Sequence, residues 1–190
     1  MDNHKNIAVF VSGSGTNCEN IIKYFREKEY ADVALVVSNR DDAYALVRAS
    51  NLNVDSVVIK KAQLADPEYV MPILQKYGID FIVLAGYLLM IPDWLIERFP
   101  QSIINLHPSL IPKYSGKGMH GRLVHEAVKA AGETETGITI HYVNNICDGG
   151  EVIQQFRTPL LPEDTVEDIE QKIHVLEQTY FPQVIDSLIK

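Results

Sequence analysis

The fold of this chain is constrained most strongly by a regular alternation of short apolar segments with longer amphipathic ones. Four segments have the composition of buried strands, at 6–11, 33–38, 56–60 and 81–85. Segments with helical patterning lie between them, at 18–28, 42–50 and 67–77. Residues 81–85 are apolar throughout, as expected of a strand at the centre of a parallel sheet. The alternation predicts right-handed crossovers and an α/β fold, a doubly wound, mostly parallel sheet covered by helices.

The second half of the chain has a different pattern. After residue 106 we expect a Pro/Gly-rich loop, a helix, two strands and a closing helix, at 108–118, 122–131, 138–143, 151–157 and from about 164. Asp148-Gly149 is a strong turn signal, which predicts an antiparallel hairpin near the C-terminus. Asp164 and Glu167 have the spacing of a capping box for the last helix. With 190 residues and no repeat or linker, the chain is expected to form a single domain over 1–190.

Composition and charge argue against several classes of protein. The formal net charge of −8, with scattered lysines and arginines, disfavours a nucleic-acid partner. No apolar run approaches the roughly 20 residues that span a bilayer, and residues 1–5 do not resemble a signal peptide, so we expect no membrane partner. Cys18 and Cys147 have neither metal-ligand spacing nor an evident disulfide framework, and no histidine pair has the spacing of a metal site. We therefore predict no metal and a cytoplasmic location.

The stretch Asn105-Leu106-His107-Pro108 places two polar side chains directly after an apolar strand at 102–104. Asn105 and His107 share one face by the two-residue period of extended chain, and Pro108 directs the chain into a loop. An amide donor and an imidazole at the carboxyl end of a strand suit a developing oxyanion and a proton transfer. Open α/β sheets also bind ligands at such strand ends. A polar strand terminus with one satisfied histidine is the alternative, and an isolated Asn-x-His would favour it.

The glycine-rich stretch Ser12-Gly13-Ser14-Gly15-Thr16-Asn17 joins the first strand to the first helix. Its glycines let the backbone approach a ligand closely, and free amides at the helix start can bind a phosphate. It lacks the lysine of a Walker loop and the third glycine of a dinucleotide site. A glycine-rich turn without a ligand is as well supported as a phosphate site. A single phosphate monoester would suit so small a loop better than a pyrophosphate.

Other polar residues allow two interpretations each. Asp148 is a turn former and could at the same time be a carboxylate that raises the pKa of a nearby His107 and makes it an acid near neutral pH. Glu177 lies on the apolar side of the last helix, where it either binds a ligand or extends to water. His141 alternates with apolar residues, and we interpret it as structural. The apolar loop 87–91 either lines a slot for a flat ring or packs in the core.

Taken together, these segments resemble the phosphoribosylglycinamide formyltransferases, a folate-dependent formyltransferase family. The matching stretches are Val11-Ser12-Gly13-Ser14-Gly15-Thr16-Asn17, Leu84-Ala85-Gly86-Tyr87, the stretch from Ile104 to Pro112, the stretch from Gly137 to Val143, and Asp148-Gly149-Gly150. The Asn-x-His-Pro-Ser-Leu block with the distal Asp-Gly-Gly is specific to enzymes that transfer formyl groups from folate. The resemblance spans essentially the whole chain and implies a Rossmann-like formyltransferase fold.

The resemblance also implies a role for each matched position. Residues 1–105 would form the half that binds phosphate and ribose, and 106–190 the catalytic and folate-binding half. Gly15, Thr16 and Asn17 would bind the phosphate of 5-phosphoribosylglycinamide, and Glu177 its ribose hydroxyls. Asn105, His107 and Asp148 would be catalytic. The co-substrate 10-formyltetrahydrofolate would contact Leu88, Leu89, Met90, Ile91, Asn105, Asn144, Asn145, Ile146, Cys147 and Asp148.

The implied reaction is formyl transfer to the glycinamide amine in de novo purine biosynthesis, by a monomer or a homodimer. Asn105 and a protonated His107 would stabilise the oxyanion, and Asp148 would keep His107 protonated. Two other functions compete with this one. A 10-formyltetrahydrofolate hydrolase would use the same three residues, but such enzymes usually have an additional N-terminal domain. A non-catalytic nucleotide-binding module would explain the glycine-rich loop but not the set Asn105, His107 and Asp148.

Overall fold

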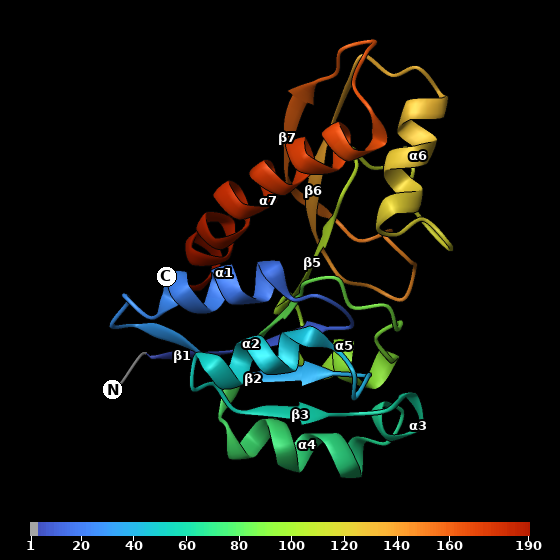
Figure 1. Cartoon of the computed structure of the whole chain (residues 1–190). Coiled ribbons are helices and arrows are strands. Elements are labelled where there is room, and N and C mark those ends of the chain that lie inside the picture. Colours follow the sequence, from blue (N-terminus) through green and yellow to red (C-terminus); the bar gives the residue numbers. More distant parts are fainter. Residues whose placement is uncertain (1–3) are drawn as a thin grey trace.

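The strands assemble into one sheet, which is parallel on one side and antiparallel on the other. The computed structural model describes residues 4–190. The expectation that residues 1–5 are not a signal peptide therefore lies partly outside it. Within this range, seven strands pair in the order β3-β2-β1-β4-β5-β6-β7 (Figure 1). Their bounds are β1 Lys5–Val11, β2 Ala31–Ser38, β3 Ser56–Val58, β4 Ile79–Leu84, β5 Ile103–His107, β6 Glu135–Tyr142 and β7 Val152–Pro159. Pairing is parallel from β3 to β5 and antiparallel from β5 to β7, which confirms the predicted sheet and hairpin.

Helices cover both faces of this sheet (Figure 1). One face packs against α1 Thr16–Phe25, α2 Tyr44–Asn51 and α7 Val166–Ile189. The other packs against α3 Lys61–Leu64, α4 Pro67–Lys76 and α5 Asp93–Arg98. Neighbouring strand residues alternate between the two cores: Ile82 and Val83 are both fully buried, on opposite faces. Helix α6 Arg122–Ala130 packs on α7 through a smaller cluster that includes Val124 and Ile169.

The same alternation determines which way the polar residues of β5 and β6 point. Ile104 and Leu106 of β5 belong to the core under α1 and α7, so Asn105 and His107 face the other side of the sheet. On β6, Ile138 and Ile140 belong to that same core, which turns His141 toward the side of Asn105 and His107. The antiparallel register pairs Asn105 with His141 and His107 with Thr139. Four polar residues therefore share one face of two adjacent strands.

Several local features differ from the expectations. β5 extends through His107 instead of ending at residue 104, because antiparallel pairing with β6 continues the strand. The capping box of α7 is formed by Thr165 and Asp168, one residue after the predicted pair. Asp164 does not cap, because its carboxylate accepts hydrogen bonds from the Leu161 amide and from Lys172. The short helices α3 and α5 were not predicted. No helix among residues 4–190 is long and apolar enough to cross a membrane.

Candidate active site

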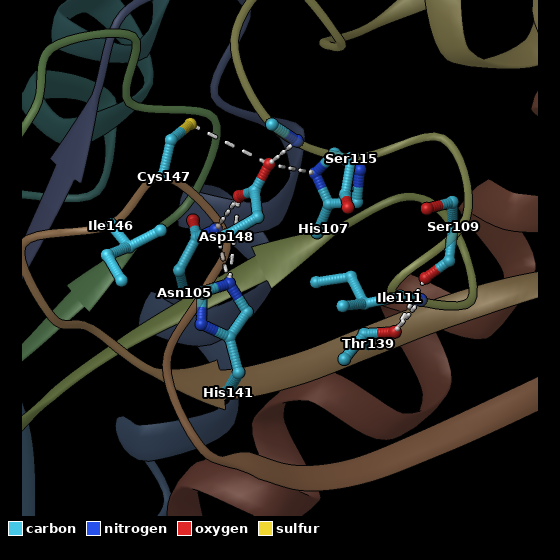
Figure 2. Close-up of polar contacts among 12 residues, drawn as sticks. Asn105, His107, Ser109, Ile111, Ser115, Thr139, His141, Ile146, Cys147 and Asp148 are labelled. Atoms are coloured by element: carbon cyan, nitrogen blue, oxygen red, sulfur yellow. Dashed lines mark hydrogen bonds and ion pairs between the residues drawn. The ribbon is translucent and has the colours of Figure 1, made fainter.

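Two side chains of β5 and one from the connection between β6 and β7 meet at the carboxyl end of β5 (Figure 2). Oδ2 of Asp148 lies 3.5 Å from Nδ1 of His107, and Oδ1 of Asp148 lies 3.4 Å from the side-chain nitrogen of Asn105. The His107 side chain is 5% exposed and that of Asp148 10%. The structure thus brings the three predicted catalytic residues into one cluster that is largely shielded from water.

Asp148 reaches this cluster because the connection between β6 and β7 has a tightly specified backbone. Asp148 itself has a φ of 53°, a left-handed conformation that Asp and Asn tolerate better than most side chains. Gly150 is required, because a Cβ there would lie 1.7 Å from the carbonyl oxygen of Tyr142. A Cβ on Gly149 would lie 2.6 Å from the exposed Ile146 side chain, which would have to move. The Asp-Gly-Gly sequence therefore suits the turn that carries the carboxylate.

His141 is a member of the cluster that the sequence interpretation missed (Figure 2). Its Nδ1 lies 2.8 Å from the Tyr142 carbonyl oxygen, which can only accept, so the ring hydrogen is on Nδ1. Its Nε2 then accepts from the side-chain nitrogen of Asn105 at 3.0 Å, and it lies 3.8 Å from Oδ1 of Asp148. His141 could have been recognised only from the strand register, because it is the β6 residue directly opposite Asn105. It contacts two of the three predicted catalytic residues.

The protonation of His107 is controlled from both sides of its ring. Nε2 lies 2.8 Å from the backbone carbonyl of Tyr114, so Nε2 carries a hydrogen and Nδ1 faces Asp148. The expectation that His107 has a raised pKa is wrong for this structure. Burial lowers the pKa of His107 below its ordinary value and outweighs the Tyr114 carbonyl and the Asp148 carboxylate, which both raise it. Asp148 does act to raise the pKa of His107, as predicted, but desolvation lowers this pKa by more.

The carboxylate of Asp148 is stabilised in its ionised form. Burial acts to raise its pKa, but the hydrogen bond from the Gly116 amide and the positive charges that the His141 and His107 rings carry when protonated hold the pKa below its ordinary value. The Gly116 amide donates to Oδ2 at 2.9 Å and joins the loop 108–121 to the carboxylate. The cluster therefore combines an ionised carboxylate with an imidazole that takes up a second proton reluctantly.

The loop 108–121 that covers His107 is fastened to β6 and β7 beneath it. The Thr139 hydroxyl donates to the Ser109 carbonyl at 2.6 Å and accepts from the Ile111 amide at 3.1 Å (Figure 2). Gln155 on β7 donates to the same hydroxyl at 2.9 Å and to the Ile111 carbonyl at 3.0 Å. Because Thr139 is fully buried, these bonds satisfy its hydroxyl and fix the start of the loop.

An apolar pocket of about 90 Å³ opens beside the cluster. It is lined by Leu84, Tyr87, Leu88, Leu89, Met90, Ile91, Asn105, His141, Val143, Asn144, Ile146, Cys147 and Asp148. All but one of the residues predicted to contact the folate are in this lining. The exception is Asn145, which is exposed and does not line the pocket. Leu88, Met90 and Ile146 are more than half exposed, which is unusual for large apolar side chains and suits a ligand surface.

The predicted phosphate and ribose residues lie together at the start of α1. Gly15 precedes the helix with a φ of 75°, and a Cβ there would lie 2.4 Å from the Cβ of Ala45. The side-chain amide of Asn17 donates to Oε2 of Glu177 at 3.0 Å. Glu177 also pairs with His174 at 3.5 Å, and this contact raises the pKa of His174. Thr16 occupies the first position of α1. The helix start and the α7 carboxylate thus form one polar surface.

The described residues offer no metal site, and the other large hollow lies away from the predicted site residues. Among residues 4–190, no group of three or more His, Cys, Asp or Glu side chains could hold a metal ion. A larger hollow of about 450 Å³ lies at the opposite ends of the strands, near Asp80 and Arg98. None of the predicted site residues lines it. The candidate site therefore consists of the cluster and pocket at the carboxyl ends of β4 and β5, together with the polar residues at the start of α1.

Comparisons with known proteins point to one family. A family model described as formyl transferase matches residues 5–185. A phosphoribosylglycinamide formyltransferase of Haemophilus influenzae is 37% identical over 186 residues, which cover 95% of this chain and 85% of that protein. The Bacillus subtilis protein of the same name is 35% identical over 190 residues, which cover 97% of this chain and 95% of that protein.

Solved structures agree with the sequence comparisons. The crystal structure of glycinamide ribonucleotide transformylase 1 from Geobacillus kaustophilus matches with a TM-score of 0.88 and 34% identity, covering 98% of this chain and all of that one. The phosphoribosylglycinamide formyltransferase of Streptococcus pneumoniae matches with a TM-score of 0.85 and 34% identity, covering 98% and 99% of the two chains.

Proposed function

Because the chain belongs to the formyl transferase family, among the phosphoribosylglycinamide formyltransferases, we propose that it transfers the formyl group of 10-formyltetrahydrofolate to the glycinamide amine of 5-phosphoribosylglycinamide. The chain is a formyl-transferring enzyme of purine biosynthesis. The observation that carries the proposal is the cluster of Asn105, His107 and Asp148 at the edge of an apolar pocket. Such a cluster suits acyl transfer between a bound amine and a bound flat ring.

The two substrates would occupy two parts of the site, the start of α1 and the apolar pocket. The phosphate would bind at Gly15, Thr16 and Asn17, where free amides begin α1, and the ribose hydroxyls would bind Glu177. The two predicted halves of the chain thus share this substrate, since Asn17 of the first half contacts Glu177 of the second. The reduced folate supplies the formyl carbon. Leu88 to Ile91 and the 144–148 turn would enclose its pterin ring.

Asn105 and His107 would act on the formyl oxygen. As the amine adds to the formyl carbon, negative charge develops on this oxygen, and hydrogen bonds from the Asn105 amide and from His107 would stabilise it. Nδ1 is the His107 nitrogen that faces the reacting atoms, because Nε2 is committed to Tyr114. It can donate only when the ring is protonated, since the hydrogen of the neutral ring is on Nε2. In the free protein, Asn105 directs its amide nitrogen to His141 and Asp148, so substrate binding would redirect one of these hydrogens.

Asp148 would manage the protons of the reaction. Its ionised carboxylate lies beside Nδ1 of His107, where it favours the imidazolium against the effect of burial. The same carboxylate would accept a proton from the attacking amine, directly or through a water molecule, and return it toward the leaving nitrogen of the folate. The low pKa of Asp148 keeps it ionised and ready to accept at neutral pH.

A single assay tests the proposal against its two rivals. The purified protein is incubated with 10-formyltetrahydrofolate, with and without 5-phosphoribosylglycinamide, and formylated product, tetrahydrofolate and formate are measured. Formyl transfer that needs the amine is the expected result. Formate release without the amine would identify a hydrolase instead. No turnover of the folate under either condition would favour a binding module.

A further inference from the structure

Tyr114 holds an unusual position in the loop that covers His107. Its φ is 53°, a left-handed backbone conformation that is costly for a bulky side chain. Its carbonyl oxygen accepts from Nε2 of His107 at 2.8 Å and from the Ser109 hydroxyl at 3.3 Å. Its own hydroxyl donates to Oε1 of Glu133 at 2.8 Å. Strained residues persist where their surroundings hold them, and they concentrate at functional sites.

We propose that Tyr114 and Glu133 are positioning residues that hold the Nε2–H of His107 against the Tyr114 carbonyl, so that Nδ1, the nitrogen that takes up the second proton, faces Asp148 and the substrate. Glu133 lies in the connection between α6 and β6 and does not contact the predicted reacting groups. It acts through the Tyr114 side chain, which fixes the backbone carbonyl against the His107 ring. The inference rests on the proposed function, in which His107 acts at the formyl group.

The chemical reason lies in the two tautomers of a neutral imidazole. A carbonyl oxygen can only accept, so its contact with Nε2 requires a hydrogen there. Without that carbonyl, the ionised Asp148 at 3.5 Å would draw the single hydrogen to Nδ1. The imidazolium, which needs an acceptor at both ring nitrogens, would then keep Asp148 at Nδ1 but lose its acceptor at Nε2. Nε2 would be left without a partner in a buried site, and the carbonyl contact that raises the pKa of His107 would be lost.

Glu133 is well placed to hold Tyr114 from outside the cluster. Its side chain is 23% exposed, and besides the Tyr114 hydroxyl it accepts from Nζ of Lys113 at 2.8 Å. The neighbouring Lys113 side chain is 64% exposed, so its ion pair is screened by solvent. The bond to Tyr114 is the more shielded of the two and leads directly to the residue that contacts His107. The hydrogen bond between Tyr114 and Glu133 is therefore the contact that the variants should remove.

The test uses Glu133→Ala, which removes the acceptor, and Glu133→Gln, which keeps an oxygen for the Tyr114 hydroxyl. Glu135→Ala is the matched control, because Glu135 is a neighbouring exposed carboxylate that pairs with Arg157. Imidazole nitrogen NMR of the free protein reports the His107 tautomer without any catalysis. We expect the Nε2–H form in the wild type, Glu133→Gln and Glu135→Ala, and a shift toward Nδ1–H in Glu133→Ala.

Kinetics supply the second measurement. In Glu133→Ala we expect kcat to fall roughly 10- to 100-fold, as for a misplaced catalytic group, with KM values changed less than about twofold. A Glu133→Ala protein with the wild-type tautomer and kcat would overturn the inference. If that variant does not fold, Tyr114→Phe keeps the ring and removes only the hydroxyl, and the same two measurements decide. Failure of the wild type to transfer formyl groups would instead refute the proposed function, while the NMR result would still stand.

Discussion

The side-chain nitrogen of Asn105 lies 3.0 Å from Nε2 of His141, directly across the antiparallel ladder between β5 and β6. The rigid sheet thus holds two polar groups of the site in register. Asp148, by contrast, is carried by a turn with a left-handed backbone and two closely packed glycines. The cluster therefore combines fixed groups on the strands with one carboxylate whose position depends on a specified turn. This division suggests how each part responds to mutation.

Asp148→Asn should remove the carboxylate without disturbing the turn. Asn tolerates the left-handed backbone at this position as well as Asp does, so the variant should fold normally. His107→Ala removes the partner of the carboxylate. We expect each variant to lose at least about 100- to 1,000-fold in kcat/KM, the usual effect of removing a group that stabilises the transition state. Thermal unfolding checks that both are folded, and normal turnover in either variant would refute its assigned role.

His141→Leu should destabilise the protein as well as slow it. The substitution removes the acceptor for the Asn105 amide and leaves a polar group shielded from water without that partner. We expect the free energy of unfolding to fall by about 1–3 kcal/mol, measured by urea denaturation. His141→Gln restores a side-chain oxygen and should recover part of this loss. Equal stability of His141→Leu and the wild type would show that the Asn105–His141 contact contributes nothing.

The central part of the fold could be predicted from local patterns. Unbroken apolar strands such as 81–85, separated by helical segments, predicted a parallel sheet, and Asp148-Gly149 predicted the hairpin. The limits of β5 could not be found in the same way. Its last residues, Leu106 and His107, pair with β6 and lie beyond the last residue that pairs with β4. Such pairing joins segments that are distant in sequence, and no local pattern encodes it.

The site residues likewise divide into those that local patterns predict and those that depend on contacts between distant segments. Asn105 and His107 were identified from their shared face and their place at a strand end, which are local properties. His141 has the same alternation with apolar neighbours as any structural histidine, and its role depends on the residue across the ladder. The lowered pKa of His107 also follows from tertiary structure, because the loop 108–121 buries the ring. A charge pair can be predicted from sequence motifs, but the desolvation of a side chain can be judged only from the packed structure.

Gly15 and Gly13 offer a matched pair for the proposed phosphate site. Gly15→Ala combines a φ of 75° with a Cβ 2.4 Å from that of Ala45, so the helix start must shift. We expect a loss of about 1–2 kcal/mol in stability from the backbone alone, and a raised KM for 5-phosphoribosylglycinamide. A Cβ on Gly13 meets nothing within 4 Å, so Gly13→Ala should be nearly neutral in stability. Equal KM values in Gly15→Ala and Gly13→Ala would contradict a phosphate site at this helix start.

Lowering the pH from about 7 to 5 should destabilise the protein in part through His125. This side chain is 4% exposed, and its Nδ1 has no hydrogen-bond partner within the described residues. Burial lowers its pKa below the ordinary value of 6.5, despite the opposing charges of Glu170 and Glu177. As the pH falls, His125 therefore takes up its proton in the unfolded chain before it does so in the folded chain. The contribution of His125 to the free energy of unfolding falls as the pH drops through about 6.5.

His125→Leu should reduce this loss. Urea denaturation at pH 7, 6 and 5 gives the free energy of unfolding, and its decrease should be smaller in the variant than in the wild type. His174→Gln is the opposite control: contact with Glu177 raises the pKa of His174, so protonation there stabilises the folded state at low pH. Removing it should steepen the decrease. If His125→Leu shows the same decrease as the wild type, His125 binds its proton equally well in the folded and unfolded chains, and the acid sensitivity arises elsewhere.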